Sequence, residues 1–252
     1  MDVKLIQATL NPLEVMWVSA RTCYSEKSPI ELWKESLLVS SDKKWKLIKQ
    51  VLESGHQSIA EHVIFTFAIE GVSRVLTHQL VRHRHCTFSQ QSQRYVEIKE
   101  DMGELYRLLH SISPSKSIGK LMIICNKYFV GVTKENVFSY SEALWEYLKR
   151  IHDGEKPEDA RMILPNASKT NIVVTINLRE LIHVSNLRLC TRAQAEIRRL
   201  FKEIKKAVEE YNSEISTLLV PSCEILGICK EHKSCGKKPH ISEIIKNDKK
   251  EK

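Results

Sequence analysis

Residues 62–95 read HVIFTFAIEGVSRVLTHQLVRHRHCTFSQQSQRY. The first part alternates apolar side chains between the two faces of an extended chain, which predicts a half-buried strand. A short helix is expected next, because Ser73 can cap the helical spacing that follows it. The basic face of this helix consists of Arg74, His78 and Arg82. We interpret residues 82–95 as the loop that follows, and it concentrates three arginines and two histidines among glutamines and hydroxyls.

The rest of the chain mixes helical patterns with one more strand pattern. Residues 170–178, TNIVVTINL, are rich in β-branched side chains and predict a strand. Capping signals or apolar spacing predict further helices, at Asn11 with Glu14, at Ser41 or Asp42, at 117–131, at 134–150, and at 191–215 with Thr191 and Gln194 as a capping box. We therefore expect an α+β fold in one domain, residues 1–228, followed by a basic, flexible tail, residues 229–252.

Composition restricts the class of protein. The chain has 252 residues, a net charge of +8 and seven cysteines at irregular spacing. No window approaches the roughly 18 consecutive apolar residues of a membrane span, and the N-terminus lacks a signal-peptide pattern. Residues 230–252 hold eight lysines against four acidic residues, so half of the excess charge lies in the tail. We expect a cytoplasmic protein with reduced thiols that binds small anions, not nucleic acid or a membrane.

Several familiar sites are disfavoured by spacing. The sequence contains no glycine-rich phosphate loop, so a bound nucleotide must be held by side chains, a task that suits the planar fork of arginine. His56 and His62 are six residues apart, which does not match the i, i+4 spacing of a zinc protease helix. The tail cysteines lack CxxC pairs, so we expect packed or free thiols and no metal, although three cysteines and a histidine can form a tetrahedral site.

Two cysteines lie in a basic sequence context. Cys86 and Cys190 lie near arginines in the sequence, a setting that can lower a thiol pKa and create a nucleophile. Small buried residues are the commoner role of such cysteines. Ser92 is also a poor candidate nucleophile, since no His–Asp pair is positioned by sequence to activate it.

The basic stretch resembles the signature of a known family. Arg82, His83 and Arg84 are followed by HCTFSQQ and then Ser92, which is similar to the R-H-R, seven-residue, Ser pattern of the flavin-dependent thymidylate synthases. Four flanking blocks resemble the family in the same order: GHQSIAEHVIFTF, DARMILP, NLREL and SNLRLCTRAQAEIR. Thr87 stands where the family often has serine, and a hydroxyl is kept. The resemblance covers about residues 55–198.

The resemblance implies an α+β fold with a mixed, mainly antiparallel sheet flanked by helices, and the reductive methylation of dUMP to dTMP. In such enzymes 5,10-methylenetetrahydrofolate donates the carbon, and FAD reduced by NADPH supplies the hydride. By matching positions, dUMP is bound by Gln79, Arg82, Gln90, Gln91, Ser92, Gln93, Arg94, Arg161 and Arg188. FAD is bound by His56, Ser58, Glu61, Arg82, His83, Arg84, His85, Gln90, Asn177, Arg179 and His183.

Arg188 is expected to be the catalytic residue, because a guanidinium against the imide edge of uracil stabilises the N3-deprotonated ring. The resemblance also implies a homotetramer with shared active sites. Two other hypotheses remain open: a flavin enzyme that methylates another pyrimidine nucleotide, and a nucleic-acid-binding protein that uses the basic loop. The second predicts salt-dependent oligonucleotide affinity and leaves Arg161 and Arg188 unexplained.

Overall fold

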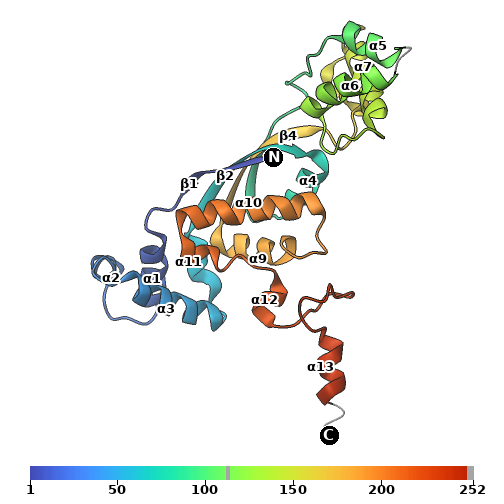
Figure 1. Cartoon of the computed structure of the whole chain (residues 1–252). Helices are drawn as coiled ribbons and strands as arrows, with labels where there is room; N and C mark the ends of the chain where they lie inside the picture. The colour runs from blue at the N-terminus through green and yellow to red at the C-terminus, as the bar shows by residue number, and fades with distance from the viewer. Residues whose placement is uncertain (112–113, 249–252) are drawn as a thin grey trace. The chain divides into compact units, whose positions relative to one another are not determined.

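The computed structural model describes residues 1–111 and 114–248 (Figure 1). The chain divides into two compact units, and most strands contribute residues to both. The larger unit comprises Asp2–Ala68, His83–Phe88 and Val173–Lys252. The smaller unit comprises Met1, Ile69–Arg82 and Ser89–Ile172.

A four-stranded sheet has the order β1-β2-β4-β3. Its strands are β1 (Asp2–Ala8), β2 (Ile64–Ser73), β3 (Cys86–Gln90) and β4 (Lys169–Asn177). In the larger unit the hydroxyls of Thr66 and Thr175 are 3.0 Å apart, and in the smaller unit Gly71 N donates to Asn171 Oδ1 at 3.0 Å. Residue numbers thus rise along β2 as they fall along β4, so this pair is antiparallel. The predicted α+β class with a mainly antiparallel sheet is confirmed.

The predicted strands β2 and β4 are confirmed, and so is the burial of alternate residues, at Val63 just before β2 and at Phe65, Phe67 and Ile69 within it. The interpretation of residues 82–95 as a loop was wrong over Cys86–Gln90, which forms β3. Strand β1 was not predicted at all. Both lie at the ends of the strand order, and each is short, with seven and five residues, so neither sequence gives more than a brief periodic signal before a neighbouring strand pairs with it.

Helices of the larger unit cover the sheet and extend beyond it. They are α1 (Pro12–Thr22), α2 (Pro29–Ser36), α3 (Ser41–Glu53), the 3₁₀ helix η1 (Gln57–His62), α9 (Leu178–Arg188), α10 (Ala195–Tyr211), α11 (Ser213–Ser216), α12 (Ser222–Leu226) and α13 (Ile241–Asp248). Figure 1 shows α9 and α10 running side by side beneath the strands. The Tyr211 ring meets Phe65 edge-on, with centroids 5.9 Å apart, and its hydroxyl donates to the Thr9 carbonyl.

Three capping predictions were wrong. Asn11 adopts a left-handed conformation (φ 54°) and makes no side-chain cap, while Glu14 pairs with the buried Lys44. The cap of α3 is Ser40, and the cap of α10 is Gln194 in place of Thr191. The long helix predicted over 191–215 also breaks after Tyr211, where Asn212 caps α11. Cap identity depends on the backbone angle at which the chain arrives, which is set by packing.

The smaller unit contains the short helix α4 (Arg74–Leu80) and a helical bundle. The bundle consists of α5 (Met102–Leu109), α6 (Pro114–Tyr128) and α7 (Val137–His152), followed by α8 (Pro157–Ala160) and the 3₁₀ helix η2 (Arg161–Ile163) (Figure 1). Leu105, Leu121 and Tyr147 form part of its buried core. Helices α6 and α7 were predicted and α5 was not. No helix in the described ranges has the length and apolar content needed to cross a bilayer.

Candidate active site

An open cleft in the larger unit gathers part of the predicted flavin-binding set. Its volume is about 590 Å³. It is lined by Gln57, Glu61, His85, Asn177, Arg179, Glu180 and His183. We call this cavity the α9 cleft, because four of its lining residues lie at the end of β4 or in the first turns of α9. Five of the seven were predicted from sequence, and Gln57 and Glu180 were missed.

The N-terminus of α9 shapes this cleft. Asn177 ends β4 and caps the helix, its side-chain oxygen accepting from Glu180 N at 2.9 Å. The partial positive charge of a helix N-terminus favours a bound anion. Arg179, half-exposed in the first turn, is paired with Glu61 of η1. The cleft thus offers a cation, a helix terminus and two histidines to a ligand.

The buried His83 contacts the half-buried Arg188 in the same unit. Arg188 Nε donates to His83 Nε2 at 3.1 Å, and His83 Nδ1 lies 3.9 Å from Glu180 Oε1. Burial, followed by the charges of Arg188 and His183, lowers the pKa of His83 to about 4. His83 is therefore neutral at physiological pH, with Nε2 as the acceptor that orients Arg188. Burial also lowers the pKa of Arg188 from its ordinary value.

This pKa predicts an acid-dependent loss of stability. The folded pKa of His83 lies below its ordinary value of 6.5, so on acidification the unfolded chain takes up a proton first. Stability should fall as pH drops through 6.5 towards 4, and chemical denaturation should show wild type losing about 1 kcal/mol more than His83→Gln between about pH 6 and pH 5. His152→Gln, at an exposed site, is the matched control and should behave as wild type. Parallel curves for wild type and His83→Gln would contradict a buried neutral histidine.

A second cluster lies in the smaller unit, around the end of β3. Gln90 donates to the hydroxyls of Thr77 (3.2 Å) and Thr170 (3.3 Å), while the Gln91 side chain accepts from Asn171 at 3.1 Å. The Ser92 hydroxyl accepts from Arg94 N at 3.1 Å. Glutamines of the signature are therefore committed largely to holding the strand end, which fixes the position of the polar groups beside them.

Arginines gather in this second cluster. Arg74 Nε donates to Gln93 Oε1 at 3.1 Å, and burial followed by the charge of Arg161 lowers the pKa of Arg74. Arg161 donates to the Glu158 carbonyl (3.1 Å), and Arg94 pairs with the Glu158 carboxylate (2.7 Å). Two guanidinium groups this close repel each other, and an anion bound between them would relieve that repulsion. We call Arg74, Ser92, Arg94 and Arg161 the phosphate cluster.

Several predicted site residues belong neither to the α9 cleft nor to the phosphate cluster. His56, Ser58, Arg82 and Arg84 are exposed, and the Gln79 amide donates to the carbonyl of Val75 on its own helix at 3.3 Å. Arg74 was missed as a site residue. Its i, i+4 spacing from His78, and that of His78 from Arg82, placed it on the basic face of the predicted helix. Its proximity to Arg161 could not be predicted, because the two residues are far apart in the sequence.

Cysteine nucleophilic catalysis has no support at Cys86. Burial, and then the charge of Glu180, raises the pKa of Cys86 to about 12, so its thiolate is scarce at neutral pH.

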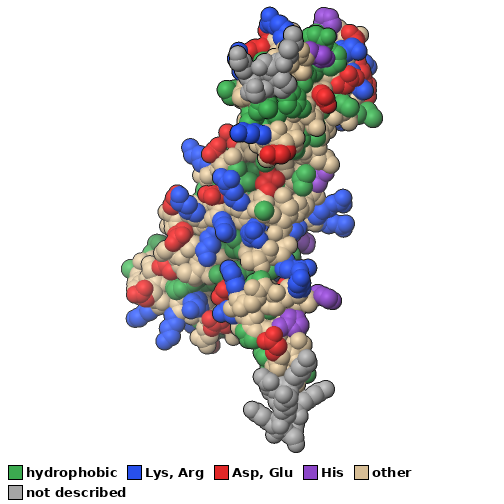
Figure 2. Space-filling view, turned by 45° about the vertical axis from the view of Figure 1, so that its right-hand side comes forward, with side chains coloured by type: hydrophobic (Ala, Val, Ile, Leu, Met, Phe, Trp, Pro, Cys, Tyr) green, Lys and Arg blue, Asp and Glu red, His purple; other side chains and the backbone are tan. Residues whose placement is uncertain are grey.

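The distribution of surface charge bears on the nucleic-acid-binding hypothesis. Figure 2 shows Lys and Arg side chains spread over the visible face and interleaved with acidic ones. A nucleic-acid-binding face would carry a contiguous basic patch.

Comparison with known proteins extends over nearly the whole chain. The profile of the family described as thymidylate synthase complementing protein matches residues 4–211. A flavin-dependent thymidylate synthase of Geobacter sulfurreducens is 36% identical over 249 residues, covering 98% of both chains. The Pyrococcus horikoshii enzyme of the same name is 40% identical over 234 residues, covering 91% of this chain and 89% of its own.

A solved structure shares the fold. The flavin-dependent thymidylate synthase of Helicobacter pylori, crystallised with FAD and dUMP, superposes with a TM-score of 0.68 at 22% identity. The match covers 87% of this chain and all of that chain. Since the family profile and close relatives both span the described clusters, the chain belongs to the flavin-dependent thymidylate synthase family.

Proposed function

We propose that this chain converts dUMP to dTMP, with FAD as cofactor and with NADPH and 5,10-methylenetetrahydrofolate as co-substrates. The observation that carries the proposal is the α9 cleft, because five residues that the family resemblance assigns to FAD line it together. Its volume of about 590 Å³ lies within the range of about 300–1,000 Å³ that is usual for small-molecule sites. The phosphate cluster supplies a separate group of cations for the nucleotide.

The residues of the α9 cleft fit the chemistry of a flavin nucleotide. A pyrophosphate suits the N-terminus of α9 together with Arg179, once that arginine exchanges Glu61 for the ligand. Asn177 and His183 offer polar contacts beside it. When bound and reduced by NADPH, FAD supplies the hydride that turns the transferred methylene into a methyl group.

The phosphate cluster fits a nucleoside monophosphate. A dianionic phosphate favours bidentate guanidinium and a hydroxyl, and Arg74, Arg161 and Ser92 provide these. Arg188 is proposed to stabilise the uracil anion that forms when N3 is deprotonated, which makes C5 electron-rich. His83 accepts from Arg188 while neutral, so it fixes the guanidinium without neutralising its charge.

Glu158 should compete with the substrate. Its carboxylate lies 2.7 Å from Arg94 Nε, so a phosphate that engages Arg94 must displace it. Exposed ion pairs contribute about 0.2–1 kcal/mol, so Glu158→Gln should lower the KM for dUMP by at most about fivefold without changing kcat. Steady-state kinetics measure this directly. Glu146→Gln, which removes a comparable exposed carboxylate from Arg150, should leave KM unchanged, and an increase in KM for Glu158→Gln would contradict competition.

The decisive test is spectroscopic. Purified protein should be yellow, should bleach when NADPH is added without oxygen, and should then form dTMP when dUMP and methylenetetrahydrofolate are supplied. A colourless protein that binds no added FAD would reject the proposed function. A yellow protein that bleaches but acts on a different pyrimidine nucleotide would keep the flavin site and reject dUMP as substrate.

We also propose a homotetramer with shared active sites. Large apolar side chains are strongly exposed in the single chain, among them Leu38 at 89% and Met162 at 80%, as expected of surfaces that meet partners. Scattering or gel filtration should report the tetramer, and a stable monomer with full flavin would contradict shared sites.

We further propose a cytoplasmic location, which the free thiols support. The proposed catalytic domain is residues 1–228.

A further inference from the structure

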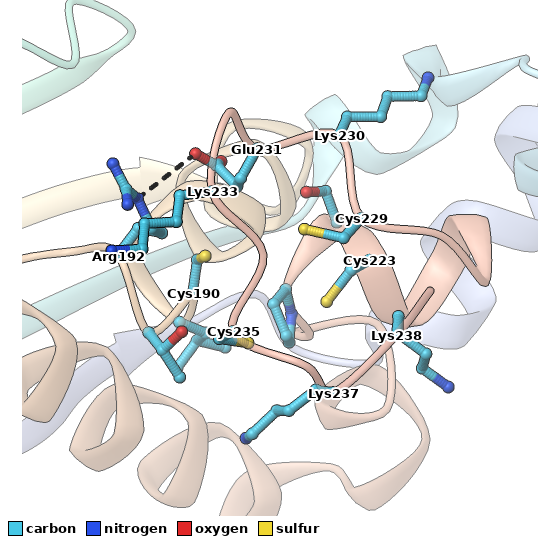
Figure 3. Close-up of a pocket in the computed structure, with 14 residues that line it drawn as sticks. Cys190, Arg192, Cys223, Cys229, Lys230, Glu231, Lys233, Cys235, Lys237 and Lys238 are labelled. Atoms are coloured by element: carbon cyan, nitrogen blue, oxygen red, sulfur yellow. Dashed lines mark ion pairs between the residues drawn. The ribbon is translucent and has the colours of Figure 1, made fainter. Parts of the chain in front are cut away.

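Four of the seven cysteines line a single small cavity in the larger unit. They are Cys190, just beyond the end of α9, Cys223 in α12, and Cys229 and Cys235 in the segment that follows. Figure 3 shows their sulfur atoms pointing toward the space between these segments. The cavity measures about 40 Å³, which suits an ion or a water molecule and excludes an organic ligand.

The segment that carries three of these cysteines has almost no apolar core. From residue 221 to 245, Cys229 is the single buried residue, while Ile225 and Leu226 are 59% and 46% exposed. The backbone is nevertheless organised: Cys229 N donates to the Pro239 carbonyl at 2.8 Å, and Ile241 N donates back to the Cys229 carbonyl at 3.0 Å. Short segments that cannot bury enough apolar surface are commonly held by disulfides or by a structural metal.

The charges around the cavity favour bound thiolates. Its lining includes five basic residues, Arg192, Lys230, Lys233, Lys237 and Lys238, and one acidic residue, Glu231. Four thiolates around a divalent ion carry a net negative charge, which this lining offsets.

We propose that Cys190, Cys223, Cys229 and Cys235 form a structural site for one zinc ion. Zinc prefers four tetrahedral thiolate ligands in closed structural sites. Among the described residues no three Cys, His, Asp or Glu side chains already stand at metal-binding separation, so the sulfurs must close around the ion. Cys190 follows Arg188 by two residues, and the metal therefore anchors the C-terminal segment to the end of the helix that carries Arg188. Any flexible tail then begins after Cys235.

The test uses the full-length protein purified without chelators. Elemental analysis should find about one zinc per chain in wild type, and chelation should expose residues 221–245 to limited proteolysis. Since losing even an outer-shell partner of a metal costs about 10–100-fold in affinity, each of Cys190→Ser, Cys223→Ser, Cys229→Ser and Cys235→Ser should lose the metal after dialysis. Cys23→Ser is the matched control, because Cys23 is exposed just after the end of α1 and lies outside the cavity, and it should retain zinc.

A second measurement uses only the wild-type protein, so the proposal can be tested even if the cysteine variants misfold. Wild type reconstituted with Co²⁺ should show the intense thiolate charge-transfer absorption of a tetrahedral sulfur site. Metal-free wild type that binds neither Zn²⁺ nor Co²⁺ would overturn the proposal. An intact mass that shows these four cysteines paired as disulfides, or zinc retained in all four variants, would also overturn it. None of these results depends on catalytic activity.

Discussion

Arg188→Ala is expected to abolish thymidylate synthesis while the protein stays yellow. Arg188 is half-buried, oriented by the neutral His83 at 3.1 Å, and proposed to stabilise negative charge on the uracil ring. Removing one preorganised donor to a developing anion costs about 10²–10³ in kcat. The loss should appear in kcat, with a smaller change in the Kd for dUMP, because the phosphate is held elsewhere.

The controls separate activation from folding. Arg150→Ala removes a surface arginine of α7 and should leave kcat unchanged. Arg188→Lys keeps the charge but loses the planar fork, and it should recover part of the activity. The flavin spectrum and NADPH bleaching report whether the α9 cleft survives each change. Turnover of Arg188→Ala within a few-fold of wild type would show that another group activates the ring.

Arg74→Ala should produce the second large effect, on substrate affinity. A charge-assisted hydrogen bond is worth about 1.5–3 kcal/mol, so the KM for dUMP should rise by roughly 10- to 100-fold. The reason is that Arg74 is half-buried near Arg161, so that two positive charges lie where a dianionic phosphate can bind. The ratio of the affinity for dUMP to the affinity for deoxyuridine should also fall, since deoxyuridine lacks the phosphate.

Arg74 also holds Gln93, so a structural role must be distinguished from phosphate binding. Arg74→Lys restores charge without the fork and should recover most of the preference for dUMP over deoxyuridine. A purely structural loss would weaken both ligands equally and would not respond to lysine. An unchanged ratio in Arg74→Ala would remove this arginine from the phosphate cluster.

Local pattern was sufficient for much of the fold. The alternation along β2, the β-branched run of β4 and the Ser73 cap of α4 were read correctly from the sequence, because each depends on a few adjacent residues. Strand β3 was misread because the same polar residues suit a loop until a neighbouring strand supplies hydrogen bonds. The Thr191 cap failed for a related reason, since α10 begins after Gln194, whose side chain accepts from Ile197 N.

By itself the sequence determined the family and the chemical types at the site, since a signature and ordered blocks are properties of adjacent residues. Tertiary structure alone decided which side chains meet. It brought Arg74 near Arg161, placed His83 against Arg188, and gathered Cys190 with three cysteines of the C-terminal segment. These contacts join residues far apart along the chain, and the distances between them follow from packing that no local pattern encodes.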